Sequence, residues 1–158
     1  MRPHMRHTMR QIVRLISALA IGVALSACAS AKAVSPQFIA SNAPASGPFS
    51  PAVRVGSTLY LSGQIGTDAS GTLVKGGIDA ETRQVMNNIK AVVEANGSTM
   101  DRVVKCTVFL ADMKEWPAMN VVYATFFPNH KPARSAMGAN GLARDSRVEI
   151  ECIAIVGR

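Results

Sequence analysis

The sequence contains few of the residues on which several large classes of enzyme depend. Two of its three histidines lie within the first seven residues, and only His130 stands in the remainder of the chain. A serine–histidine hydrolase or a histidine-rich metal site is therefore not expected. One tryptophan and two tyrosines offer little surface for stacking sugars, so the neighbouring glutamates Glu149 and Glu151 do not predict a glycosidase.

Acidic residues and long apolar runs are both missing from the start of the chain. Residues 1–27 contain four arginines and no acid, and the apolar run from Leu15 to Leu25 is shorter than the roughly 20 residues of a membrane-spanning helix. A basic start followed by a short apolar run is typical of a secretory signal. Loss of these four charges lowers the formal net charge from +7 to +3, and the remaining charges form no basic stripe, so nucleic-acid binding is not expected.

The segment LSAC at residues 25–28 ends this signal and resembles the bacterial lipobox. In that motif the cysteine receives a diacylglyceryl group and becomes the mature N-terminus, which makes Cys28 the expected lipidation site. The absence of an aspartate after Cys28 favours the periplasmic face of the outer membrane. Cleavage after Ala33 would instead give a soluble periplasmic protein. Residues 28–45, rich in Ala, Ser and Pro, are expected to form a flexible tether.

Residues 46–158 are long enough for one compact domain, and the apolar content of 48% for the whole chain supports a packed core. The segments 53–55 and 58–62 alternate in polarity on either side of Gly56 and Ser57. This pattern predicts a β-hairpin at the start of the domain.

Two segments have apolar residues at helical spacing. The first begins at a candidate N-cap, Asp79, and ends at Asn96 and Gly97, which are typical of a helix C-terminus. The second lies between Pro117, at a position suited to the first turn, and Pro128. We therefore expect two helices.

Three further segments, residues 103–110, 133–138 and 146–157, are expected to be strands. The order of elements is then β-β-α-β-α-β-β. It predicts an α+β domain in which two helices cover one face of a sheet.

The last strand has one fully apolar face and one mixed face. Alternation places five small or apolar residues on the first face: Val148, Ile150, Cys152, Ala154 and Val156. Glu149 and Glu151 share the second face with Ile153 and Ile155. Two isoleucines do not suit a solvated face, and two unpaired glutamates do not suit a buried one. We therefore expect this second face to lie partly against another subunit, with the glutamates near the edge of the contact.

Two cysteines remain once Cys28 is assigned to the anchor. Cys106 and Cys152 both lie in strand-like segments. An oxidising compartment would allow a disulfide between them, but two small buried thiols are the favoured interpretation. No histidine is placed by the sequence to activate either thiol, so neither is expected to be a nucleophile.

Several separate stretches resemble the RidA (YjgF-type) family, the reactive-intermediate imine and enamine deaminases. The most specific is PARSAMGANGLARDSRVEIE near the C-terminus, and four more agree in order: NAPASGPFSPAVRVGSTLYLSGQIG, QVMNNIKAVVEANG, VVKCTVFLADM and MNVVYATFF. The resemblance covers roughly residues 40–158. It implies a chorismate-mutase-like fold with a mixed sheet, and a homotrimer whose sheets form a central barrel with a site at each subunit interface. The implied activity is hydrolysis of 2-imino or enamine acids, such as 2-aminoacrylate, to 2-keto acids and ammonia, without a metal or organic cofactor.

The resemblance also implies the roles of individual residues. Arg134 would hold the substrate carboxylate bidentately through its planar guanidinium. Glu149 would orient or activate the attacking water. Ser62 and Asn120 match polar residues that line the pocket, and Gly63 keeps the backbone beside Ser62 open to close approach.

The sequence departs from the family pattern at three places. Phe49 replaces the usual tyrosine, Ala136 replaces a frequent cysteine, and Asn140 stands where a small or basic residue is preferred. Phe49 and Ala136 would line the substrate pocket, so their loss of a hydroxyl and a thiol bears on substrate choice. From residue type alone, Arg134 could instead form an interface ion pair, and Trp116 is expected to fill the core or an interface.

Two other functions follow as alternatives. A trimeric lipoprotein that binds small carboxylates without turnover is compatible with the Phe49 replacement and with an exported location. Ribonuclease or translation-inhibiting activity, also associated with this family, is disfavoured by export and by the charge of +3 that remains after removal of the signal.

Overall fold

The structure, a computed structural model, describes residues 33–40 and 48–157. The predicted signal peptide at 1–27 and the lipidation site Cys28 lie outside the described residues. Within the described ranges, no helix has both the length and the apolar character needed to cross a membrane.

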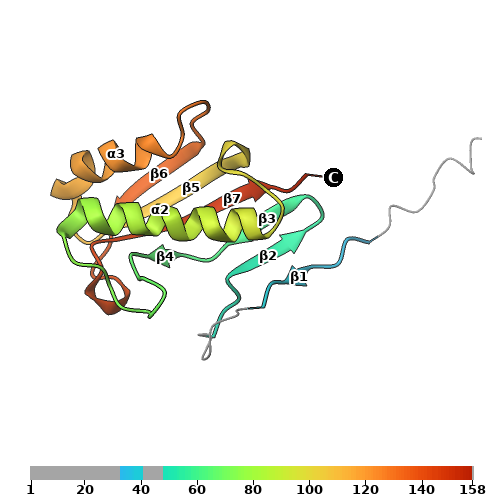
Figure 1. Ribbon diagram of the computed structural model, residues 1–158, viewed down its shortest axis with the longest axis horizontal. Coiled ribbons are helices and arrows are strands. Elements are labelled where there is room, and N and C mark those ends of the chain that lie inside the picture. The colour runs from blue at the N-terminus through green and yellow to red at the C-terminus, as the bar shows by residue number, and fades with distance from the viewer. Residues whose placement is uncertain (1–32, 41–47, 158) are drawn as a thin grey trace, which may run out of the picture. The chain divides into compact units, whose positions relative to one another are not determined.

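Seven strands form one mixed sheet in the order β1-β2-β3-β7-β5-β6, and the short strand β4 also pairs with β7 (Figure 1). The strands are β1 (Gln37–Phe38), β2 (Ala52–Val55), β3 (Thr58–Leu61), β4 (Gln64–Ile65), β5 (Val103–Leu110), β6 (Ala133–Gly138) and β7 (Val148–Ile155). The pairing of β5 with β6 is parallel, and every other described pairing is antiparallel. This arrangement confirms the predicted mixed sheet.

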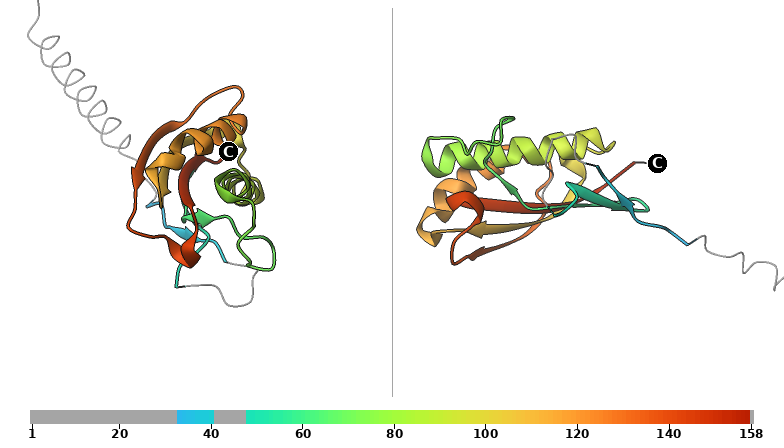
Figure 2. Two further views of the ribbon diagram at one scale, coloured as in Figure 1. Left: turned by 90° about the vertical axis from the view of Figure 1, so that its left-hand side faces the viewer. Right: turned by 90° about the horizontal axis from the view of Figure 1, so that it is seen from below.

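Both long helices lie on one side of the sheet (Figure 2), which confirms the predicted α+β class. They are α2 (Gly77–Ala95) and α3 (Trp116–Thr125), and three short 3-10 helices connect other elements: η1 (Met100–Arg102), η2 (Met113–Glu115) and η3 (Ala143–Asp145). The apolar stripes of both helices are buried against the sheet; their fully buried members include Val85, Met86, Ile89, Val93 and Met119.

The start of α2 differs from the prediction. The helix begins at Gly77 rather than after Asp79, because Gly76 takes the cap position with a φ of 123°, which a side chain would disfavour. Asp79 lies instead in the first turn, where its charge suits the positive end of the helix dipole. The predicted C-terminus is confirmed, since Asn96 is the C-cap and Gly97 follows with a φ of 75°.

The sheet also begins earlier in the chain than predicted. Gln37 and Phe38 form β1 by pairing with Arg54 and Val53 of β2, and the Ile39 N–H donates to the Ala52 carbonyl at 2.9 Å. Part of the segment assigned to a flexible tether, residues 28–45, is therefore a strand. Composition did not reveal it, because a two-residue edge strand has no alternation to detect.

The two faces of β7 differ as predicted. Its helix-side face is buried in the core, whereas no described helix covers the other face, where Glu149 and Ile153 are half-buried and Glu151 is exposed. The strand register places Phe38, Val53, Tyr60 and Ile153 side by side in one row across this open face. The open face therefore combines an apolar row with the glutamates of β7.

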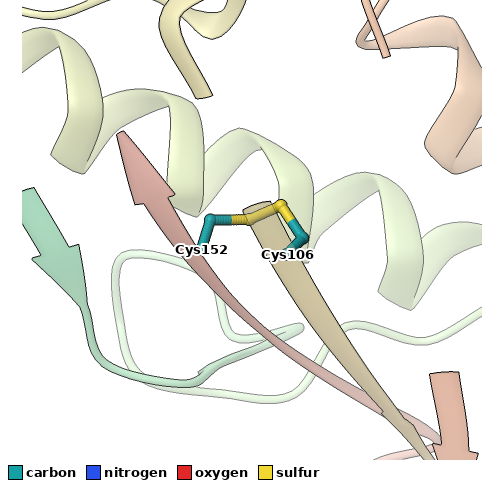
Figure 3. Close-up of a disulfide and its surroundings, with 2 residues drawn as sticks. All are labelled: Cys106 and Cys152. Carbon is teal, nitrogen blue, oxygen red and sulfur yellow. A yellow bond between two sulfur atoms is a disulfide. The ribbon is translucent and has the colours of Figure 1, made fainter. Parts of the chain in front are cut away.

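Cys106 of β5 and Cys152 of β7 form a disulfide (Figure 3). The favoured interpretation of two free buried thiols is thus wrong. The two residues are direct partners in the antiparallel β5–β7 register, with Cα atoms 4.1 Å apart. Both lie in the core, so the bond ties together the two central strands of the domain.

Candidate functional site

A one-residue irregularity in the sheet opens a groove beside β7. Tyr60 of β3 pairs with Ile153, whereas Gln64 of β4 pairs with Ile150, so the segment between β3 and β4 contains one residue more than the facing part of β7. Such a bulge redirects the side chains next to it. A groove of about 600 Å³ lies here, lined by Phe49, Ser62, Gly63, Gln64, Ile65, Thr67, Gly71, Ala143, Arg144 and Glu149.

Glu149 and Gly63 are in direct contact within this groove. A Cβ added to Gly63 would lie 2.0 Å from Glu149 Oε1, so only glycine leaves room for the carboxylate against the backbone. No hydrogen bond or ion pair joins the Glu149 carboxylate to another described residue. Among the described residues, the Glu149 carboxylate thus has no polar partner, and it lies half-buried in a groove.

Ser62 and Phe49 lie at one end of the groove. The Ser62 hydroxyl donates to the Ser50 carbonyl at 2.7 Å, and the Ser62 N–H donates to the Pro51 carbonyl at 3.0 Å. Ser62 therefore holds the segment that carries Phe49 against β3, while its oxygen can still accept a hydrogen bond. Phe49 is 60% exposed, which makes it available to a ligand or to another subunit.

Helix α2 and a tight turn fix the far side of the groove. The Asn88 amide donates to the carbonyls of Ile65 and Thr67, at 3.1 and 2.9 Å. In the following turn the Ser70 hydroxyl and the Thr72 N–H donate to Asp68, and they hold the pKa of its carboxyl below the ordinary value. The loop beside the groove is thus ordered by hydrogen bonds that the sequence did not indicate.

Arg144 closes this side of the groove. Its φ of 58° is unusual for a residue with a side chain, and its guanidinium donates to the Gly71 carbonyl. Sequence interpretation missed Gln64, Ile65, Thr67 and Arg144 as lining residues, because their position depends on the bulge and on loop geometry rather than on a periodic pattern.

A second polar constellation lies on edge strand β6 and helix α3. Arg134 is half-buried, with its Cζ 4.6 Å from the centroid of the Tyr123 ring and 5.7 Å from that of Trp116. Asn120 lies between the two aromatic residues on the same face of α3, as the helical spacing requires. Ala136, two residues after Arg134, packs against the core.

The predicted site residues therefore fall into two groups. Arg134 pairs in parallel register with Cys106, whose side chain is on the helix side of the sheet. Glu149 is on the open face, with Phe109 as its partner on β5. Arg134 and Glu149 of one chain consequently lie on opposite faces, and the structure does not bring them together. Elsewhere in the described residues, no three His, Cys, Asp or Glu side chains cluster as metal ligands.

Known proteins are similar to this chain in both sequence and fold. The family model described as Endoribonuclease L-PSP matches residues 40–156. A mouse protein named 2-iminobutanoate/2-iminopropanoate deaminase is 46% identical over 112 residues, which cover 70% of this chain and 83% of the relative.

Two solved structures give the same result. The match to the yeast protein YEO7 has a TM-score of 0.73 and 40% sequence identity. It covers 78% of this chain and 100% of the yeast chain. The match to RidA from an Antarctic Psychrobacter has a TM-score of 0.71 and 39% sequence identity. It covers 76% of this chain and 99% of the Psychrobacter chain. The chain is therefore a member of the Endoribonuclease L-PSP family, the family of RidA and YjgF that its C-terminal motif predicted.

Proposed function

We propose that the protein hydrolyses 2-imino acids and their enamine forms to 2-keto acids and ammonia, at sites shared between the subunits of a homotrimer. The names of its curated relatives, including the mouse deaminase, support this reaction. The observation that carries the proposal is a guanidinium and a carboxylate on separate surfaces, neither with a hydrogen bond or ion pair to a described residue.

The opposite positions of Arg134 and Glu149 favour a site between subunits. The carboxylate and the imine carbon of the substrate are adjacent groups, so the residues that act on them must lie a few ångströms apart. One chain alone does not meet this requirement. Strand β6 lies at the edge of the sheet, where its outer backbone groups can meet a neighbour, and the open face presents an apolar row that a second subunit would cover.

In the proposed mechanism, Arg134 of one subunit binds the substrate carboxylate through two parallel N–H donors. Glu149 of the next subunit accepts a proton from a water molecule. The oxygen of that water attacks C2 of the protonated imine, and the π electrons of the C=N bond move to nitrogen. Glu149 then returns the proton to the amine. Glu149 next takes the proton of the C2 hydroxyl as the C–O bond becomes a carbonyl and the C–N bond breaks. The departing ammonia accepts that proton, so the 2-keto acid and ammonium are released and the Glu149 carboxylate is restored. Since the iminium carbon is already electrophilic, positioning and one general base suffice.

Glu149→Gln tests this role of the carboxylate. We expect kcat for 2-iminopropanoate, generated in situ by an amino-acid oxidase, to fall by about 10²-fold with little change in KM, because glutamine preserves shape but cannot take a proton. Ammonia release above the uncatalysed background is the measurement. Glu151→Gln, on the same face of β7 but outside the groove, is the matched control. Equal activity of wild type and Glu149→Gln would exclude Glu149 as the base.

Gly63→Ala should act on the same residue without changing its chemistry. The added methyl carbon would lie 2.0 Å from Glu149 Oε1, closer than two non-bonded atoms allow. The carboxylate must therefore move, and we expect kcat to fall by about 10-fold or more. Gly138→Ala is the comparison, since Gly138 lacks a positive φ and the nearest atom to an added Cβ is Cγ of the exposed Met113 side chain, at 3.1 Å. Wild-type kcat in Gly63→Ala would show that the position of the carboxylate does not matter.

Phe49 and Ala136 favour a second candidate function, the capture of small carboxylates without turnover, because they lack the hydroxyl and thiol common in the family. The ammonia-release assay separates the two. Binding of pyruvate without acceleration of any oxidase-generated imine would favour the binding protein over the deaminase.

We propose in addition that the protein is exported and anchored through a lipid on Cys28. The disulfide supports export, since such bonds form and persist in oxidising compartments. In a bacterial host, the wild-type chain should be found with membranes and require detergent for release, whereas Cys28→Ser should not receive the lipid and should lose this association. Recovery of both proteins from the cytoplasmic fraction would refute the proposal.

A further inference from the structure

Two ring faces contact the Arg134 guanidinium, and no residue that the structure describes forms a hydrogen bond or ion pair with it. Both of its aromatic distances, 4.6 Å to Tyr123 and 5.7 Å to Trp116, fall within the roughly 6 Å over which a cation is attracted to the face of a ring. From the sequence, Trp116 is expected only to fill the core or an interface. In the structure its ring also contacts the Arg134 guanidinium.

Both rings come from helix α3. Trp116 and Tyr123 are seven residues apart, which is about two helical turns, so they project from the same face. The Tyr123 ring is only 5% exposed and packs against Phe127, with the ring centroids 5.0 Å apart. The rings are thus part of a rigid helix and, for Tyr123, of the core itself.

The Tyr123 hydroxyl adds no hydrogen bond to a described residue, although it is buried. Burial raises the pKa of Tyr123 to about 12, against the opposing effect of the Arg134 charge. The phenol is therefore neutral at physiological pH, and its contact with Arg134 is made by the ring face. We expect the ring, rather than the hydroxyl, to matter for Arg134.

We propose that Trp116 and Tyr123 are positioning residues that orient Arg134 for the substrate carboxylate, an inference that rests on the proposed role of Arg134. Aromatic faces attract the flat surface of a guanidinium and leave the N–H donors at its edge free. A carboxylate partner would instead occupy those donors and compete with the substrate. The two rings therefore fix the cation while preserving its capacity for bidentate binding.

The test measures the affinity for pyruvate, a 2-keto acid product, by calorimetry. We expect Trp116→Leu and Tyr123→Leu each to weaken pyruvate binding by roughly 3- to 30-fold, whereas Tyr123→Phe, which keeps the ring, should retain wild-type affinity. Phe127→Leu is the matched control, because it removes a buried aromatic ring from the same cluster with no cation–π contact to Arg134. It should lower the melting temperature as Tyr123→Leu does, with no loss of affinity.

Steady-state kinetics separate this inference from the proposed function. The two leucine variants should raise KM for 2-iminopropanoate more than they lower kcat, since they disturb carboxylate binding rather than proton transfer. If wild type binds pyruvate but hydrolyses no imine, the proposed function fails and the positioning role is judged by affinity alone. Unchanged pyruvate affinity in both leucine variants, or no affinity in wild type, would overturn the positioning role.

Discussion

Arg134→Lys is expected to lower kcat/KM for 2-iminopropanoate by roughly 10²- to 10³-fold. Lysine keeps the positive charge but replaces a planar fork of donors with a single ammonium group, so bidentate binding of the carboxylate is lost. The ammonium would also lie differently against the rings of Trp116 and Tyr123. Ammonia release from oxidase-generated imines gives the rate, and size-exclusion chromatography reports whether the oligomer is intact.

Arg54→Lys provides the matched control for this prediction. Arg54 lies on β2, and its Nε donates to the Gly56 carbonyl at 2.9 Å, outside both groups of predicted site residues. The same chemical change there should leave kcat/KM within about twofold of wild type. Full activity of Arg134→Lys in a protein that hydrolyses imines would show that Arg134 does not bind the carboxylate.

Reduction of the Cys106–Cys152 disulfide should destabilise the domain by about 4 kcal/mol, as the loop-closure relation gives for cysteines 46 positions apart. The bond joins adjacent central strands and both cysteines are buried, so reduction also frees two thiols in a packed core. The measurement is the free energy of unfolding from urea titrations of oxidised and reduced protein. Reduction should also lower the melting temperature by roughly 10–20 °C.

A Cys106→Ala/Cys152→Ala double variant separates the disulfide from other effects of the reductant. Its unfolding curve should be the same with and without reductant, and should resemble that of the reduced wild type. Two outcomes would contradict the disulfide. One is the detection of two free thiols in denatured protein that was purified without reductant from an oxidising compartment. The other is a free energy of unfolding that reduction does not change.

Periodicity in the sequence predicted the elements that bury an apolar face. The alternation of β7 correctly divided its residues between a buried and a more exposed face. The 3.6-residue spacing located α2 and α3, because both kinds of pattern reflect burial against one partner surface. The short strands β1 and β4 were missed, since two residues are too few to show a period. The actual start of α2 was missed because it depends on the unusual backbone of Gly76.

The register between paired strands could not be predicted from one sequence. The disulfide follows from the β5–β7 register, which places Cys106 opposite Cys152. The separation of Arg134 from Glu149 follows from the parallel β5–β6 register, which sets Arg134 on the helix side. A shift of one residue in either register would place the side chains of the shifted strand on the opposite face of the sheet. The family motif predicted a role for both residues, but not that one chain holds them on opposite faces of its sheet.

Activity of mixed oligomers shows whether Arg134 and Glu149 act together across a subunit interface. Arg134→Ala and Glu149→Gln are each expected to be nearly inactive alone. In trimers assembled at random from equal amounts of the two variants by co-expression, about a quarter of the interfaces would pair an intact Arg134 with an intact Glu149. We therefore expect the mixture to recover about a quarter of the wild-type kcat per site. Activity no greater than that of the separate variants would show that the two residues do not act across an interface.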